Sequence, residues 1–144
     1  MNLCAAALCL SIAPVMVSAA DRCAELRKLL ASAEARFPDT APAEILTTAD
    51  KCTIADDERG GKTYLCLWQY SYRDAAAGAA FRALSDDIRT CLDEIAILPA
   101  DTAVNHPDSY LLHRFRRGNM VISVSLKDKA ALGQSLVFLR IDRE

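Results

Sequence analysis

The sequence predicts an α+β fold, in which an antiparallel sheet of about five strands carries two helices on one face. Two segments repeat apolar residues at helical spacing, and five others read as extended segments, several with clear alternation. Short connections let neighbouring strands pair as hairpins, and the helices are long enough to cover one sheet face. The expected order is α-β-β-α-β-β-β, stapled by two disulfides.

The first helix is expected over residues 21–37, because an apolar stripe recurs there at helical spacing and Pro38 follows it. The second is expected from Arg73-Asp74 to about Leu92, with charged residues away from its buried stripe. The two expected stripes are Leu26, Leu29, Leu30, Ala33 and Phe37, and Ala77, Phe81, Leu84, Ile88 and Cys91.

The first two strands are expected over residues 45–54 and 62–72, with residues 57–61 as the turn between them. In the second strand, alternate residues from Tyr64 to Tyr72 share one face, while Leu65 and Leu67 take the other. Large side chains on both faces indicate a central strand.

The last third of the chain predicts a hairpin. Residues 110–117 and 120–127 flank Gly118-Asn119, a two-residue turn signal. Pairing across it places apolar partners such as Phe115 and Ile122 on one face, and polar partners such as Arg114 and Ser123 on the other. A last strand is expected over residues 136–141. Residues 93–108 are expected to be mostly loop.

The first twenty residues predict a cleavable secretory signal peptide, which leaves residues 21–144 as a single domain. This start lacks charged residues, holds an apolar run from Leu8 to Val17, and ends on small residues. The run is too short to span a membrane, and no membrane span is expected after it. The alternatives are a membrane anchor that stays attached, an ordinary buried helix, and lipidation at Cys9 or Cys4. The expected location is the periplasm of a bacterium, or the extracellular space.

Four cysteines remain after signal removal, and an even number in an exported chain predicts two disulfides. A hairpin around residue 59 sets Cys52 opposite Cys66, and antiparallel helices bring Cys23 to Cys91. The alternative pairs Cys66 with Cys91 and Cys23 with Cys52. Because C-x-x-C spacing is absent, we expect no metal site and no cofactor.

The formal net charge of −2 argues against nucleic acid and anionic membranes as partners. No catalytic residue is predicted. His113 is expected on the apolar face of its strand, where Ser123 and Ser125 cannot reach it. Residues 105–108 (Asn-His-Pro-Asp) are expected to turn the chain into the next strand.

Two groups could form a binding surface. The aromatic group Trp68, Tyr70 and Tyr72 is one, since Tyr and Trp dominate contact energetics, although packing under the helices is the plainer interpretation. The basic group around the hairpin is the other, and it suits an acidic protein partner better than DNA; its members are Arg114, Arg116 and Arg117, with Arg140 as a further candidate.

The leading hypothesis is an exported, non-enzymatic protein that binds a protein partner, in the manner of an inhibitor or an immunity protein. This rests on size and compartment. The alternative is a small-ligand-binding or catalytic domain with an internal pocket, similar to the cone-like α+β proteins of the nuclear-transport-factor-2-like superfamily. An accessible His113 inside a deep pocket would favour that alternative.

Overall fold

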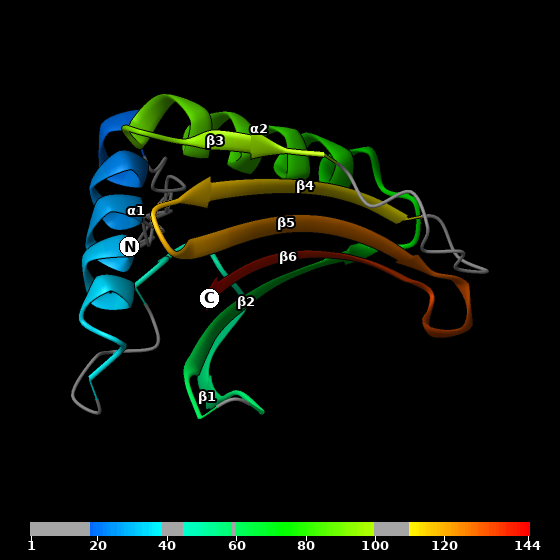
Figure 1. The fold of residues 1–144 in the computed structure, drawn as a ribbon. Helices are drawn as coiled ribbons and strands as arrows, with labels where there is room; N and C mark the ends of the chain where they lie inside the picture. The colour runs from blue at the N-terminus through cyan, green and yellow to red at the C-terminus, as the bar shows by residue number, and fades with distance from the viewer. Residues whose placement is uncertain (1–17, 39–44, 59, 100–109) are drawn as a thin grey trace, which may run out of the picture.

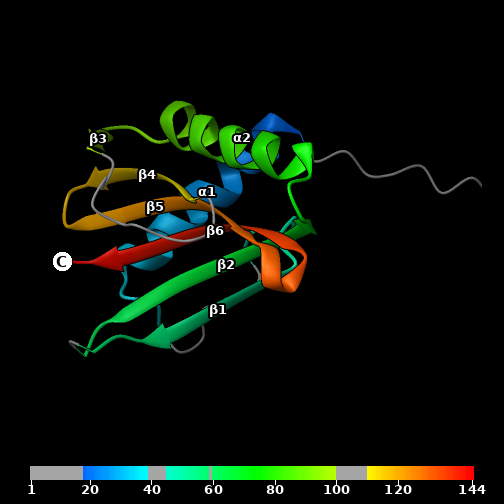
Figure 2. The ribbon, with the colours of Figure 1, turned by 90° about the vertical axis from the view of Figure 1, so that its right-hand side faces the viewer.

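The computed structural model of the 144-residue chain describes residues 18–38, 45–58, 60–99 and 110–144. One antiparallel sheet carries two helices on one side, so the α+β prediction is confirmed (Figures 1 and 2). Residues 1–17, the greater part of the predicted signal, lie outside the described residues. Neither described helix has the length and apolar character needed to cross a membrane.

Helix α1 spans Ala19–Glu34 and begins at a capping box. The Ser18 side chain accepts a hydrogen bond from the Asp21 backbone N–H, while the Asp21 side chain accepts one from the Ser18 backbone N–H. The face that turns to the sheet is aliphatic, and its buried residues are Leu26, Leu29, Leu30 and Ala33.

Helix α2 spans Ala75–Cys91 and is capped by Asp74, whose side chain accepts from the Ala76 N–H. The helix packs on strands β2, β5 and β6. A polar residue, Ser85, occupies the middle of its buried stripe, with only 1% of its surface exposed. The full stripe is Ala77, Phe81, Ser85, Ile88 and Cys91.

Six strands form the sheet, in the order β1-β2-β6-β5-β4-β3, and every neighbouring pair is antiparallel. The strands are β1 (Lys51–Asp56), β2 (Lys62–Ser71), β3 (Ala96–Leu98), β4 (Tyr110–Arg117), β5 (Met120–Lys129) and β6 (Gln134–Arg143). Strand β6 is the next strand after β5 in the sequence and lies between β5 and β2. The β1–β2 hairpin therefore joins the four later strands through the β2–β6 pair at the middle of the sheet (Figure 2).

Two strand predictions need correction. The short edge strand β3 lies in a segment that was expected to be mostly loop, because three residues before Pro99 are too few to show alternation. Strand β1 begins at Lys51, whereas a strand was expected from Ile45. Ile45 and Leu46 are buried through side-chain packing rather than through strand pairing.

The β4–β5 hairpin has the predicted register, from Tyr110 opposite Lys127 to Arg117 opposite Met120. Gly118 has a φ of +56°, and Asn119 has no positive φ. A positive φ at the first central residue alone is typical of a type II′ turn, which places glycine first. The turn therefore fixes which residues of β4 and β5 share a face.

Both preferred disulfides are confirmed. Cys23–Cys91 joins α1 to the end of α2, and Cys52–Cys66 bridges β1 and β2 across directly paired positions. The Tyr64 hydroxyl, fully buried, donates to the Cys66 sulfur at 3.0 Å, and the Tyr64 ring stacks on Phe37. The core thus lies between the helices and one face of the sheet.

Candidate functional site

The face of the sheet away from both helices, called the open face below, carries a different set of side chains. Because side chains alternate along a strand, residues that are paired across β4, β5 and β6 form rows on this face. One row is Arg114, Ser123 and Arg140, with Leu65 of β2 beyond. The next is Leu112, Ser125 and Phe138, and the third contains Tyr110 and Lys127.

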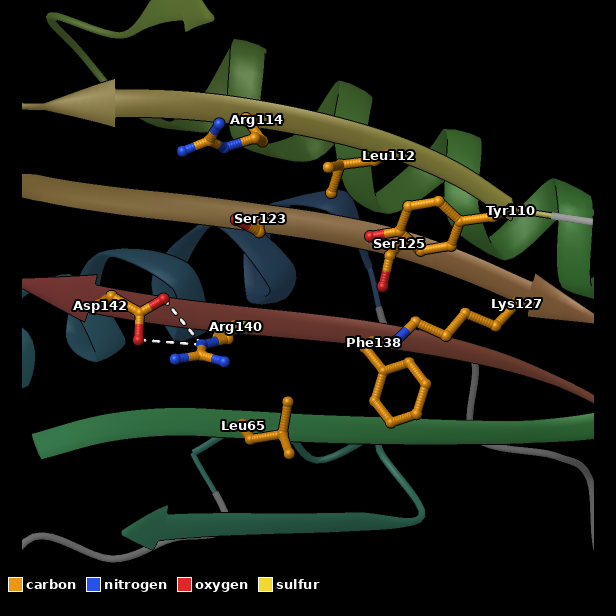
Figure 3. Close-up of a pocket in the computed structure, with 10 residues that line it drawn as sticks. All are labelled: Leu65, Tyr110, Leu112, Arg114, Ser123, Ser125, Lys127, Phe138, Arg140 and Asp142. Carbon is orange, nitrogen blue, oxygen red and sulfur yellow. Dashed lines mark hydrogen bonds and ion pairs between the residues drawn. The ribbon is translucent and has the colours of Figure 1, made fainter. Parts of the chain in front are cut away.

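A groove of about 450 Å³ runs over these rows, and it is called the trough below (Figure 3). Its floor on β5 is made by Ser123 and Ser125, which are small. Its walls are the larger side chains of the flanking strands and of β2. The hollow therefore lies over the small side chains of β5, without any break in the sheet. The lining residues are Leu65, Tyr110, Leu112, Arg114, Ser123, Ser125, Lys127, Phe138, Arg140 and Asp142.

Lys127 lies at one end of the trough, between two aromatic rings. Its Nζ is 5.4 Å from the centroid of Tyr110 and 5.3 Å from that of Phe138. Each ring attracts the ammonium through its π face, so the two hold the long side chain over the sheet. This end of the trough combines a fixed positive charge with apolar surface.

Arginines mark the other end. Arg140 donates from Nε to Asp142, at 2.7 Å to Oδ2, and Asp142 also accepts from the Thr63 hydroxyl at 2.7 Å. The hydrogen bond with Asp142 raises the pKa of Arg140 above its usual range. Arg114 lies across Ser123 from Arg140 and has no ion pair within the part of the chain that the structure describes.

The open face has more cations than carboxylates. Arg140 pairs with Asp142, and Arg116 pairs with Glu144 at 2.8 Å. Arg114 and Lys127 are left with no carboxylate partner among the described residues. The unpaired positive charges therefore stand at opposite ends of the trough.

The predicted binding residues fall on two surfaces. Arg114, Arg116 and Arg140 lie on the open face, whereas Arg117 lies on the helix side and pairs with Glu34. Trp68 and Tyr70 lie on the helix side of β2, partly buried against the core, and so do not meet the arginines of the open face. Tyr72, just beyond the end of β2, is 38% exposed, and the guanidinium carbon of Arg73 lies 5.1 Å from its ring centroid.

A second hollow, of about 350 Å³, lies on the helix side beside Trp68 and Tyr70. Its rim includes Arg22 of α1 and Asp87 of α2, which form an ion pair at 2.6 Å. Ala80 of α2 leaves room for it, because its side chain is only a methyl group. Burial, together with nearby acidic residues, raises the pKa of Tyr70.

His113 packs against α2, where Ser85 Oγ lies 2.9 Å from its Nδ1. Ser85 donates its single hydroxyl proton to the Phe81 carbonyl at 2.8 Å, so Nδ1 of His113 must be the donor in the other bond. A serine nucleophile requires the opposite arrangement, in which the hydroxyl donates to the histidine. With Ser85 also sealed from solvent, this pair holds the helix to the sheet.

Sequence reasoning missed Tyr110, Lys127 and Phe138 as site residues. The predicted register already placed Tyr110 opposite Lys127, and this pairing was the available signal. Phe138 joins them only through the β5–β6 register. Residues 105–108, the predicted turn with His106, lie outside the described residues.

Among residues 18–38, 45–58, 60–99 and 110–144, no three His, Cys, Asp or Glu side chains are grouped so as to hold a metal ion. No protein-family model matches the chain, and comparison with curated proteins finds no match.

Proposed function

We propose that this protein is an exported, non-enzymatic binding protein that holds a protein partner on its open face, as inhibitors and immunity proteins hold theirs. The observation that carries the proposal is the trough, in which aromatic rings and unpaired cations lie on a sheet face turned away from both helices. Tyr and Arg are enriched among the residues that dominate binding energy at protein interfaces.

The sheet supports such a role because it presents these side chains on rigid backbone. Arg114, Ser123 and Arg140 sit at directly paired positions of three adjacent strands, so their spacing is set by strand pairing rather than by loops. Preorganised groups lose little conformational entropy when a partner binds.

A non-enzymatic role is supported by the arrangement around His113. The Ser85–His113 pair has its hydrogen bonds in the wrong direction for nucleophile activation. Burial, and then the charge of Arg89, lower the pKa of His113, which favours the neutral, structural imidazole.

Export is supported by the two disulfides, which persist in oxidising compartments. Together with the expected signal peptide over residues 1–20, they favour a periplasmic or extracellular location.

A second candidate function, the binding of a small ligand, is favoured by the hollow beside Trp68 and Tyr70. A ligand there would contact two aromatic side chains and the Arg22–Asp87 pair. His113 is absent from the lining of this hollow, so a ligand would not meet the one described histidine.

Affinity capture from the native source, followed by mass spectrometry, tests the proposal. The mature protein and two variants serve as baits. Ser123→Tyr fills the trough, and Ala79→Tyr adds the same side chain to an exposed position of α2. We expect one stoichiometric partner with the mature protein and with Ala79→Tyr, and its loss with Ser123→Tyr. A partner that is retained equally by all three baits would exclude the trough as its site.

A further inference from the structure

Along β5, the three rows of the trough offer a positive charge, then apolar surface, then a second positive charge. The row at Ser123 offers the unpaired guanidinium of Arg114, the row at Ser125 offers the apolar surfaces of Leu112 and Phe138, and the row at Lys127 offers an ammonium. Same-face residues of one strand recur about every 6.8 Å, so the two unpaired cations belong to rows about 13.5 Å apart.

An extended peptide repeats at the same spacing. Its side chains i, i+2 and i+4 point to one side and are about 6.8 Å apart. A segment that lies along the trough, parallel or antiparallel to β5, can therefore place one side chain over each row. Opposite charge is favoured at both outer rows, and an apolar side chain is favoured between Leu112 and Phe138 in the middle row.

From this match we infer that the trough binds an extended acidic segment of a protein partner, with a carboxylate, an apolar side chain and a second carboxylate at positions i, i+2 and i+4. This inference rests on the proposed function and names the partner's chemistry at the same site. One carboxylate pairs with Arg114 beside Ser123, and the other pairs with Lys127.

The aromatic setting of Lys127 makes its charge available to such a segment. Tyr110 and Phe138 hold the ammonium by their rings and leave it without a carboxylate partner among the described residues. At the other end, Asp142 is occupied by Arg140 and Thr63, so it does not compensate Arg114. Within the described residues, neither Arg114 nor Lys127 forms an ion pair that an incoming carboxylate would have to break.

The test is a titration of the isotope-labelled mature protein, disulfides intact, followed by NMR. The probe is the blocked peptide acetyl-Glu-Thr-Leu-Thr-Glu-amide. A permuted peptide, acetyl-Glu-Leu-Thr-Glu-Thr-amide, has the same composition but sets its carboxylates on opposite sides of an extended chain. A third peptide replaces both Glu residues with Lys.

We expect saturable shifts at the Ser123 and Ser125 amides and at the rings of Tyr110 and Phe138 with the first peptide only. Arg114→Gln and Lys127→Gln should each raise its Kd about three- to tenfold. The matched controls Arg82→Gln and Lys28→Gln, at exposed helix positions, should leave the Kd unchanged.

Three results would overturn the inference: no saturable shift on the open face, equal binding of the permuted or the lysine peptide, or binding that is indifferent to Arg114 and Lys127. The capture experiment distinguishes a failure of this inference from a failure of the proposed function. If the acidic peptide fails while partner capture still depends on Ser123, only the inferred segment is wrong. If capture ignores Ser123→Tyr, the proposed function itself fails.

Discussion

At the scale of single residues, His113 shows how its neighbours decide the role of a reactive side chain. Ser85 accepts from its Nδ1, and the Phe81 ring lies 4.6 Å from the imidazole. The sequence correctly predicts that His113 faces away from Ser123 and Ser125, because alternation along a strand is regular. It does not reveal Ser85 as the partner, since that contact depends on how α2 is rotated about its own axis.

This environment predicts a pH dependence of stability. Burial lowers the pKa of His113 below its usual 6.5, with a further contribution from Arg89. At His113 the unfolded chain therefore binds a proton more readily than the folded chain does. Because of this difference, the free energy of unfolding decreases as the pH falls below about 6.5. In His113→Asn the amide cannot titrate, and this part of the decrease should vanish.

Urea unfolding of the mature protein and of His113→Asn, at about pH 7.5 and about pH 5.5, measures this difference. If His113→Asn loses as much unfolding free energy between the two pH values as the parent does, groups other than His113 cause the pH dependence of stability.

At the scale of elements, a disulfide and an ion pair connect α1 to α2, and a second disulfide connects β1 to β2. The Cys23–Cys91 disulfide and the Arg22–Asp87 ion pair lie at adjacent positions on α1, and Cys52–Cys66 closes the first hairpin. The two disulfides were predicted, because a hairpin sets Cys52 opposite Cys66 and antiparallel helices bring Cys23 to Cys91, whereas the ion pair was not predicted. The short strand β3 was not predictable, since its pairing with β4 depends on where α2 ends.

The two disulfides should differ in what they contribute to stability. Cys23–Cys91 closes a separation of 68 residues and Cys52–Cys66 one of 14. Loss of loop entropy in the unfolded chain gives about 4 kcal/mol for the longer loop and about 3 kcal/mol for the shorter. Replacing both members of each pair with alanine, followed by denaturant unfolding, should therefore destabilise the Cys23–Cys91 variant more, by about 1 kcal/mol. The reverse order would contradict a mainly entropic contribution.

At the scale of the whole molecule, the binding face depends on one long-range pairing. The β1–β2, β4–β5 and β5–β6 pairs join neighbours in the sequence, whereas β2–β6 joins strands that are separated by α2, β3, β4 and β5. That pairing brings Leu65 beside Arg140 and completes the trough (Figure 3). Local patterns cannot specify which strands meet across such a distance, so the groove was not predicted although Arg114 and Arg116 were.

The same topology places the aromatic and basic groups on opposite sides of the sheet. Trp68 and Tyr70 point toward the helices, because they share the face of Tyr64 and Cys66, whose side chains are fully buried. The two candidate functions thus belong to opposite sides of one sheet, the trough on one and the hollow beside Trp68 on the other. A measurement that distinguishes the two sides decides between them.

Hydroxyl-radical footprinting of the mature protein with its captured partner is that measurement. Oxidation rates of individual side chains are read by mass spectrometry with and without the partner. If the open face binds the partner, Tyr110, Leu112 and Phe138 are protected while Trp68 and Tyr70 react as before. Protection of Trp68 and Tyr70, with Tyr110 and Phe138 unchanged, would contradict the central claim that the open face binds the partner.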